Sequence, residues 1–98
     1  MIIVWGSLEA REGVVDELLA LSLEHVRRSR KEPGCISHAV HIDAENHNRL
    51  VFVEQWESLA ALQAHFAVPE SGRFVEQARG LAVGMPELKI YDASELAM

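Results

Sequence analysis

Residues 50–66 read LVFVEQWESLAALQAHF and join a strand to the helix that follows it. The stretch opens with four bulky apolar residues, a pattern typical of a strand that is buried on both faces. Ser58 then supplies a side-chain oxygen that can accept a backbone N–H bond and start a helix. Leu59, Leu62 and Phe66 follow at helical spacing. We therefore expect this strand–helix corner to form the centre of the fold.

The same corner carries groups that can do chemistry. Glu54 and Trp56 occupy alternate positions of the strand and therefore share one face. At about 100° per residue, His65 falls on the flank of the apolar stripe of the helix. Glu54 is either a structural carboxylate paired with an Arg or with backbone groups, or a general base with a pKa raised by burial. Trp56 is either a core or interface anchor or a ligand platform, and His65 is either a commonplace helix histidine or a proton-transfer group.

Outward from this corner, periodicity and turn signals divide the 98-residue chain into alternating strands and helices of one domain, residues 1–98. All three prolines are expected between elements. The expected order is β-α-β-β-α-β with a broken second helix, the ferredoxin-like α+β pattern with a four-stranded antiparallel sheet. The expected elements are strands at Ile2–Leu8, Cys35–Asp43, Arg49–Gln55 and Leu88–Ala93, and helices at Gly13 to about Lys31, Leu59–Ala67 and Arg73–Val83, the last with Met85 on its apolar side.

The first helix has an unusual inner face, because Ser22, His25 and Ser29 lie within its apolar stripe. A buried hydroxyl or imidazole must find a hydrogen-bond partner. One explanation is close helix–sheet packing, with the hydroxyls bonded to helix carbonyls four residues earlier. The other is that the helix covers a cavity that contains a few polar groups.

Both faces of the first and third strands are apolar, as Ile3 and Trp5 show beside Ile2 and Val4. Helices of a ferredoxin-like fold cover one face of the sheet, so the second face needs another cover. A second copy of the chain is the simplest one, and we expect a homodimer.

A metal site has little support in the sequence. Strand alternation places His38 with Ile36 and His41 with Cys35, on opposite faces, so the two histidines cannot share one ion. A set made of His25, Glu54 and His65 has no characteristic ligand spacing, and we expect no metal.

Composition excludes several classes of protein. A formal charge of −6 without a basic run argues against binding to nucleic acid or anionic membrane. The single cysteine, Cys35, excludes an intrachain disulfide, and no activating cation is evident beside it. Because Met1 leads directly into apolar residues without a basic segment, we expect no secretory signal, no membrane span and a cytoplasmic location. There is no glycine-rich phosphate loop.

The motif EQWESxxxLxxH, followed by Pro69, resembles the signature of the antibiotic biosynthesis monooxygenase domain family, and most closely its small cofactor-free quinol monooxygenases. The EPGC sequence at Glu32–Cys35 and Gly13 also stand where that family has them. The resemblance implies a homodimer whose two sheets close into an α/β barrel. Haem-degrading relatives carry an Asn, a Trp and a His at places that are Gly6, His65 and Val75 here, so haem degradation is not expected.

The residues and the resemblance together favour a monooxygenase without flavin or metal that acts on a small aromatic phenol or quinol. His65, Glu54 and His25 are the candidate catalytic residues. The candidate substrate contacts are Trp56, Ser22, Ser29 and Phe66. Two alternatives remain open at this point: a non-catalytic dimeric barrel that binds a small hydrophobic metabolite, and a small-molecule isomerase.

Overall fold

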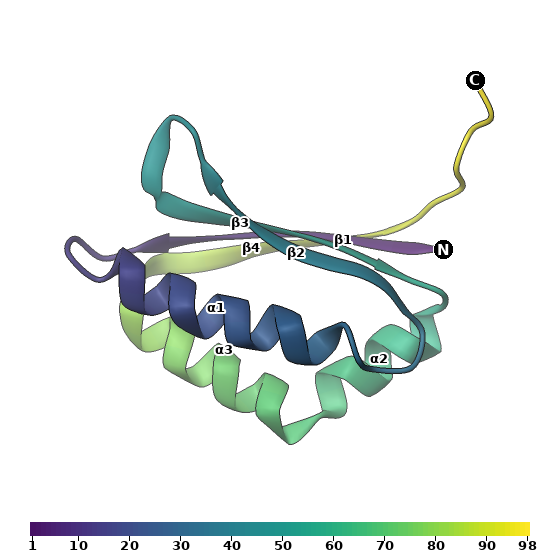
Figure 1. The fold of residues 1–98 in the computed structure, drawn as a ribbon, viewed down its shortest axis with the longest axis horizontal. Helices are drawn as coiled ribbons and strands as arrows, with labels where there is room; N and C mark the ends of the chain where they lie inside the picture. The colour runs from purple at the N-terminus through teal and green to yellow at the C-terminus, as the bar shows by residue number, and fades with distance from the viewer.

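The computed structural model describes residues 1–98 and contains four strands and three helices (Figure 1). Their order confirms the ferredoxin-like α+β fold expected from the sequence, with the second helix in two pieces. The elements are β1 (Ile2–Ala10), α1 (Val15–Ser29), β2 (Cys35–Asp43), β3 (Asn46–Trp56), α2 (Leu59–Ala67), α3 (Pro69–Leu81) and β4 (Ala82–Asp92).

The sheet has the order β2-β3-β1-β4, and every neighbouring pair is antiparallel. All three helices lie on one side of it, and the other side is bare (Figure 1). The two central strands are β1 and β3, the strands for which the sequence showed apolar residues on both faces. No helix in this fold combines the length and the apolarity that crossing a bilayer requires.

Two proline positions differ from the sequence-based expectation. Pro69 is the first residue of α3, so that helix begins four residues before Arg73. A proline fits there because the first turn of a helix leaves its N–H groups without partners in any case. Pro86 lies inside β4, which is an edge strand and tolerates a missing ladder hydrogen bond. As a result Met85 is a strand residue with 88% of its surface exposed, and not part of a helix.

The start of β2 also differs from simple alternation. A bulge interrupts the β2–β3 register between Cys35 and Ser37. Cys35 consequently packs against the buried Trp56 on the helix-covered side, while Ile36 is half exposed. From His38 to Ile42 the register is regular, and His38 is buried whereas His41 is exposed.

The core consists of two apolar clusters on the helix-covered side of the sheet. The larger contains Ala10, Leu18, Val26, Leu50, Phe52 and Ala78, and the smaller contains Val4, Trp56 and Leu62. Along β3, Phe52 belongs to the first cluster and Trp56 to the second, with the buried Glu54 between them. The clusters are therefore separated by a polar region, and that region is where the candidate site lies.

Gly34 fixes the approach of α2 to the turn that precedes β2. Its φ is +85°, a conformation that favours glycine, and a Cβ added there would lie 2.5 Å from the Cβ of Ala61. Gly13 has the same φ, yet a Cβ at Gly13 would meet nothing within 4 Å.

These two glycines allow steric crowding to be measured separately from backbone strain. We predict that Gly34→Ala lowers the free energy of unfolding by about 1–3 kcal/mol more than Gly13→Ala does. Only the methyl group added at Gly34 collides with a neighbour, the Cβ of Ala61. Urea unfolding of both variants followed by circular dichroism measures the difference. Equal losses would show that α2 moves aside without cost.

Candidate functional site

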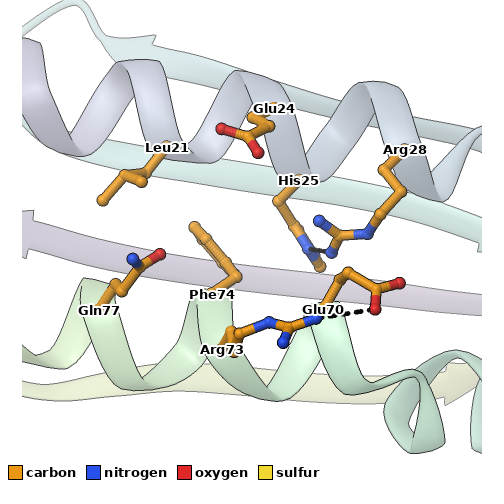
Figure 2. A pocket seen from close by; sticks show the side chains of 8 residues that line it. All are labelled: Leu21, Glu24, His25, Arg28, Glu70, Arg73, Phe74 and Gln77. Atoms are coloured by element: carbon orange, nitrogen blue, oxygen red, sulfur yellow. Dashed lines mark hydrogen bonds and ion pairs between the residues drawn. The ribbon is translucent and has the colours of Figure 1, made fainter.

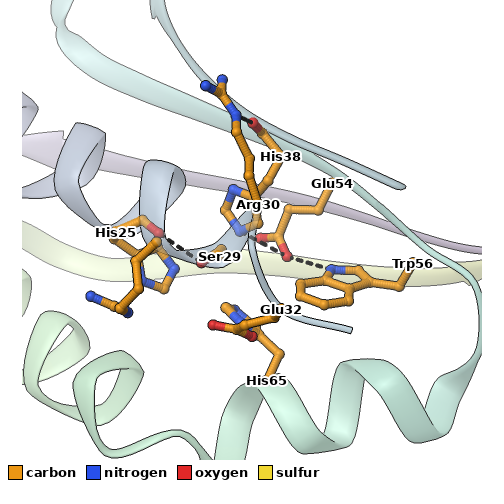
Figure 3. Close-up of polar contacts among 9 residues, drawn as sticks. His25, Ser29, Arg30, Glu32, His38, Glu54, Trp56 and His65 are labelled. Carbon is orange, nitrogen blue, oxygen red and sulfur yellow. Dashed lines mark hydrogen bonds and ion pairs between the residues drawn. The ribbon is translucent and has the colours of Figure 1, made fainter. Parts of the chain in front are cut away.

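The buried histidine and glutamate side chains gather at one place between the sheet and the helices (Figure 3). Four of them come from four elements: His25 from α1, His38 from β2, Glu54 from β3 and His65 from α2. The ring centroids of the three histidines lie 5.3–5.6 Å apart. The structure therefore brings together all three candidate catalytic residues and adds His38.

Glu54 accepts a hydrogen bond of 2.9 Å from the indole Nε1–H of Trp56. The β2–β3 register places His38 directly opposite Glu54, with its Nε2 atom 3.2 Å from the same carboxylate oxygen. Burial raises the pKa of the Glu54 carboxyl, but the contacts with His38 and Trp56 outweigh burial and hold that pKa below its usual value. Glu54 is thus a charged carboxylate paired with a histidine and an indole, and not with an arginine.

His38 has an unusual environment for a buried imidazole. Only 2% of its surface is exposed, and neither ring nitrogen has a hydrogen-bond partner within the protein. Nε2 is within ion-pair distance of Glu54. The angle between the two groups is nevertheless unsuitable for a hydrogen bond. The attraction between His38 and Glu54 is therefore electrostatic, and Nδ1 is left with an unused lone pair or proton.

His65 is held by Glu32, which comes from the turn after α1. Nδ1 of His65 lies 2.8 Å from Oε1 of Glu32. Since a carboxylate only accepts, Nδ1 carries a proton, and in the neutral ring Nε2 then carries the lone pair. The ring also lies over Trp56, with centroids 4.7 Å apart and an interplanar angle of 36°. His65 thus has a fixed tautomer, a fixed orientation and one free basic nitrogen.

His25 is oriented by an arginine and an aromatic ring. The Nη2 group of Arg28 donates to Nδ1 of His25 at 2.8 Å, and the imidazole stacks on Phe74 with centroids 4.2 Å apart. Burial and the nearby His38, His65 and Arg28 lower the pKa of His25 from 6.5 to about 3. His25 is therefore neutral near pH 7, with its proton on Nε2.

A largely apolar cavity of about 220 Å³ adjoins these groups. His25, Glu54, His65 and Phe66 are in its wall, as the sequence-based hypothesis required of a shared site. The remaining wall is mostly apolar and is completed by β1 and β4. The lining from those strands and from α3 includes Gly6, Leu8, Phe74, Val75, Ala78, Pro86 and Leu88.

Three other candidate residues lie behind the cavity wall. Trp56 is fully buried and contacts the site through Glu54 and His65. The hydroxyls of Ser22 and Ser29 donate to the carbonyls of Leu18 and His25 at 2.7 Å each. Both serines therefore follow the back-bonding explanation, and neither lines the cavity.

A second hollow of about 190 Å³ lies between α1 and α3, and His25 and Phe74 separate it from the apolar cavity (Figure 2). Arg73 pairs with Glu70 at 2.9 Å on its rim, while Arg28 faces His25. Positive and negative side chains balance there, so the hollow shows no preference for a charged ligand. The lining consists of Leu21, Glu24, His25, Arg28, Glu70, Arg73, Phe74 and Gln77.

Sequence reasoning missed Glu32, His38 and Phe74. His38 had a usable signal, because counting back across the hairpin from Glu54 leads to it once the turn is placed. Glu32 and Phe74 had none, since each meets its histidine only through packing of separate elements. Cys35 stays outside the group, and burial raises the pKa of its thiol, as expected of an unreactive cysteine.

The profile of a family described as Antibiotic biosynthesis monooxygenase matches residues 1–77. An uncharacterised protein of Synechocystis sp. (strain ATCC 27184 / PCC 6803 / Kazusa) is 37% identical over 96% of this chain. The chain spans 64% of the length of that curated relative.

Solved structures show the same fold. The crystal structure of an antibiotic biosynthesis monooxygenase is 26% identical and has a TM-score of 0.90, covering 97% of this chain and 100% of that one. A Deinococcus radiodurans protein provisionally given the same name is 24% identical, with a TM-score of 0.94 over 100% and 97% of the two chains. At that identity the second likeness shows the fold alone.

The lowered pKa of His25 predicts a pH-dependent stability. Below pH 6.5 the unfolded chain binds a proton at His25 that the folded chain does not take up until about pH 3. Stability should therefore fall as the pH drops through that window, by up to roughly 1.4 kcal/mol per pH unit from this residue. His25→Gln should flatten the curve, as measured by urea unfolding from pH 7 to 4, and His41→Gln should not. Identical curves for wild type and His25→Gln would contradict a buried neutral His25.

Proposed function

Because the chain belongs to the antibiotic biosynthesis monooxygenase family, we propose that it is a cofactor-independent monooxygenase of a small aromatic phenol or quinol. The observation that carries this proposal is the His65–Glu32 pair, which presents a basic nitrogen beside a mostly apolar cavity. The site and the family together support this proposal.

In this proposal His65 is the general base. Its Nε2 lone pair takes the hydroxyl proton of a phenol bound in the cavity, and Glu32 stabilises the imidazolium that forms through Nδ1–H. A similar arrangement of carboxylate, imidazole and hydroxyl operates in hydrolases and group-transfer enzymes, where the carboxylate orients the base. A cavity of about 220 Å³ is below the usual range of roughly 300–1,000 Å³ for drug-sized ligands, which favours a small aromatic substrate.

The proposed oxidation needs no other reductant than the substrate. The phenolate gives one electron to O₂, and the phenoxyl radical and superoxide couple at a ring carbon that carries hydrogen, ortho or para to the oxygen, to form a C–O bond. The peroxide takes back the proton from His65, and loss of the ring C–H proton then breaks the O–O bond. One oxygen atom stays in the product and the other leaves as water, so a phenol and O₂ yield a quinone and water, and a quinol and O₂ yield a hydroxyquinone and water. A dry cavity protects these intermediates from bulk solvent.

The remaining candidate residues have supporting parts in this proposal. Trp56, which is hydrogen-bonded to Glu54, lies against the ring of His65 and keeps it in place. Phe66 forms an apolar part of the cavity wall for the aromatic ring of the substrate. Neutral His25 can donate from Nε2 to the substrate oxygen or to the developing peroxide. Ser22 and Ser29 act indirectly, because their bonds to helix carbonyls hold the segment of α1 that carries His25.

We also propose that the protein is a homodimer. On the bare face of the sheet, Val53 and Tyr91 keep 36% and 50% of their surface exposed. The edge strand β4 is exposed from Val83 to its end, and an uncovered edge of this length invites pairing with another chain. Trp5 is central on this face, with Arg49 and Lys89 5.6 and 5.5 Å from its ring centroid.

We predict that protein free of flavin and metal oxidises a menadiol-like quinol or a related phenol in air. His65→Ala should lower the rate at least roughly 10²-fold, the smaller end of what a general base contributes. Glu32→Gln should reduce the rate to a lesser extent, because the Gln carbonyl can still accept from Nδ1–H but the negative charge that stabilises the imidazolium is lost. Oxygen uptake after subtraction of spontaneous oxidation is the measurement, with His41→Ala as the matched exposed-histidine control.

Absence of uptake above background over a panel of phenols and quinols would reject the monooxygenase proposal in favour of a ligand-binding protein. A substrate that is rearranged without oxygen consumption would favour the isomerase. Turnover that survives His65→Ala would keep the reaction and move the base to Glu54.

We predict that sedimentation shows a dimer at micromolar concentration with an interface of about 1,600 Å² or more. Trp5→Lys adds a third cation beside Arg49 and Lys89 and should weaken the dimer by about 100-fold or more, since an unpaired buried charge costs several kcal/mol. Leu59→Lys, on the exposed side of α2, is the control. A stable monomer for the wild type would contradict the dimer.

A further inference from the structure

The geometry points to a site for one divalent transition-metal ion formed by His25, His38 and His65. One ring nitrogen from each of these three histidines can be chosen so that all three atoms lie within 4.8 Å of one another, and all three side chains are buried. They come from α1, β2 and α2, so the cluster exists only in the folded protein. The set differs from the one considered from sequence, because His38 takes the place of Glu54.

Two of the three histidines already have features of metal ligands. Glu32 accepts from Nδ1–H of His65, which leaves the Nε2 lone pair free; a carboxylate behind a histidine is the common support for a metal ligand. His38 is 98% buried with no hydrogen-bond partner at either ring nitrogen. An unpaired buried polar group is costly, and coordination to a metal would satisfy it.

The size of the cluster requires a modest contraction on binding. A tetrahedral ion with bonds of about 2.0–2.1 Å separates its nitrogen ligands by roughly 3.4 Å. The three nitrogens must therefore approach one another by on the order of 1 Å. Rotation of side chains about Cα–Cβ bonds can supply this shift without moving the helices or the sheet.

The surrounding charges suit a divalent cation once Arg28 moves. Glu54 and Glu32 contact His38 and His65 and together carry two negative charges, which matches the charge of the ion. Arg28 opposes binding in two ways. It places a positive charge on the site, and its hydrogen bond to Nδ1 of His25 occupies one nitrogen and keeps the proton on the other. Because Arg28 also borders the hollow between α1 and α3, it has space to turn away.

Ligand chemistry selects the class of ion. Three neutral imidazoles suit Zn²⁺, Co²⁺, Ni²⁺ and Cu²⁺, whereas Mg²⁺ and Ca²⁺ prefer oxygen ligands. Three histidines are also the protein ligand set of some catalytic zinc sites, and two of the three here, His25 and His65, line the apolar cavity. The metal would occupy the His65 lone pair that the proposed oxidation needs, so a bound ion would inhibit that oxidation. Binding is therefore measured directly and not through turnover.

The test uses untagged, metal-free protein titrated with Co²⁺ followed by visible absorption, and with Zn²⁺ followed by calorimetry. One ion per chain should bind, and Co²⁺ should show the intense d–d bands of a four-coordinate site. His38→Gln should weaken binding by more than the roughly 10–100-fold that loss of an outer supporting group costs. Glu32→Gln should fall within that range. Arg28→Gln should tighten binding, because both the competing hydrogen bond and the opposing charge are removed.

His41→Gln is the matched control, because His41 is an exposed histidine on the same strand as His38. Its affinity should equal that of the wild type. If His38→Gln binds as tightly as His41→Gln, or if wild-type Co²⁺ spectra lack four-coordinate bands, the proposed site is wrong. If circular dichroism shows that His38→Gln does not fold, X-ray absorption of the wild-type protein with bound Zn²⁺ tests the site instead. Fewer than three coordinated imidazoles would overturn the proposal.

Discussion

The carboxylate of Glu54 is the constraint on which the interior of this protein depends. A charged group that is taken out of water must be paired and hydrogen-bonded, or it destabilises the fold. Here the indole of Trp56 donates to it and His38 faces it across the β2–β3 ladder. The His38–Glu54 contact joins β2 to β3 and favours the register in which these two residues face each other.

That pairing organises the space above the sheet. His38 and Trp56 each contact His65, and His38 and His65 both contact His25. Polar groups therefore continue from the sheet to both helices and divide the apolar core into two clusters. A continuous apolar core would bury more surface, and the chain instead keeps several polar atoms without partners, among them the His38 nitrogens and Oε2 of Glu32. Retention of such atoms is typical of sites that serve function at the expense of stability.

The three histidines have different chemistry although their rings are neighbours. A carboxylate holds His65 with its lone pair on Nε2, an arginine holds His25 with its proton on Nε2, and His38 has an electrostatic partner only. An imidazole held by a carboxylate, a neutral hydrogen-bond donor and an imidazole without a hydrogen-bond partner thus lie within one cluster. The proposed oxidation uses the first two, and the proposed metal site uses all three. Both depend on partners that orient the rings: Glu32 for His65, Arg28 for His25 and Glu54 for His38.

The sequence by itself determined the element order, the ferredoxin-like class and the corner that carries Glu54, Trp56 and His65. These features depend on periodicity and capping within a few residues, which local side-chain geometry controls. Only the tertiary structure decided that Glu32 supports His65, since 33 residues separate the two. It also decided the bulge beside Cys35 and the inclusion of Pro86 in an edge strand. Periodicity shows which side chains of one element share a face, whereas the meeting of faces from different elements follows from strand register and helix packing over the whole chain.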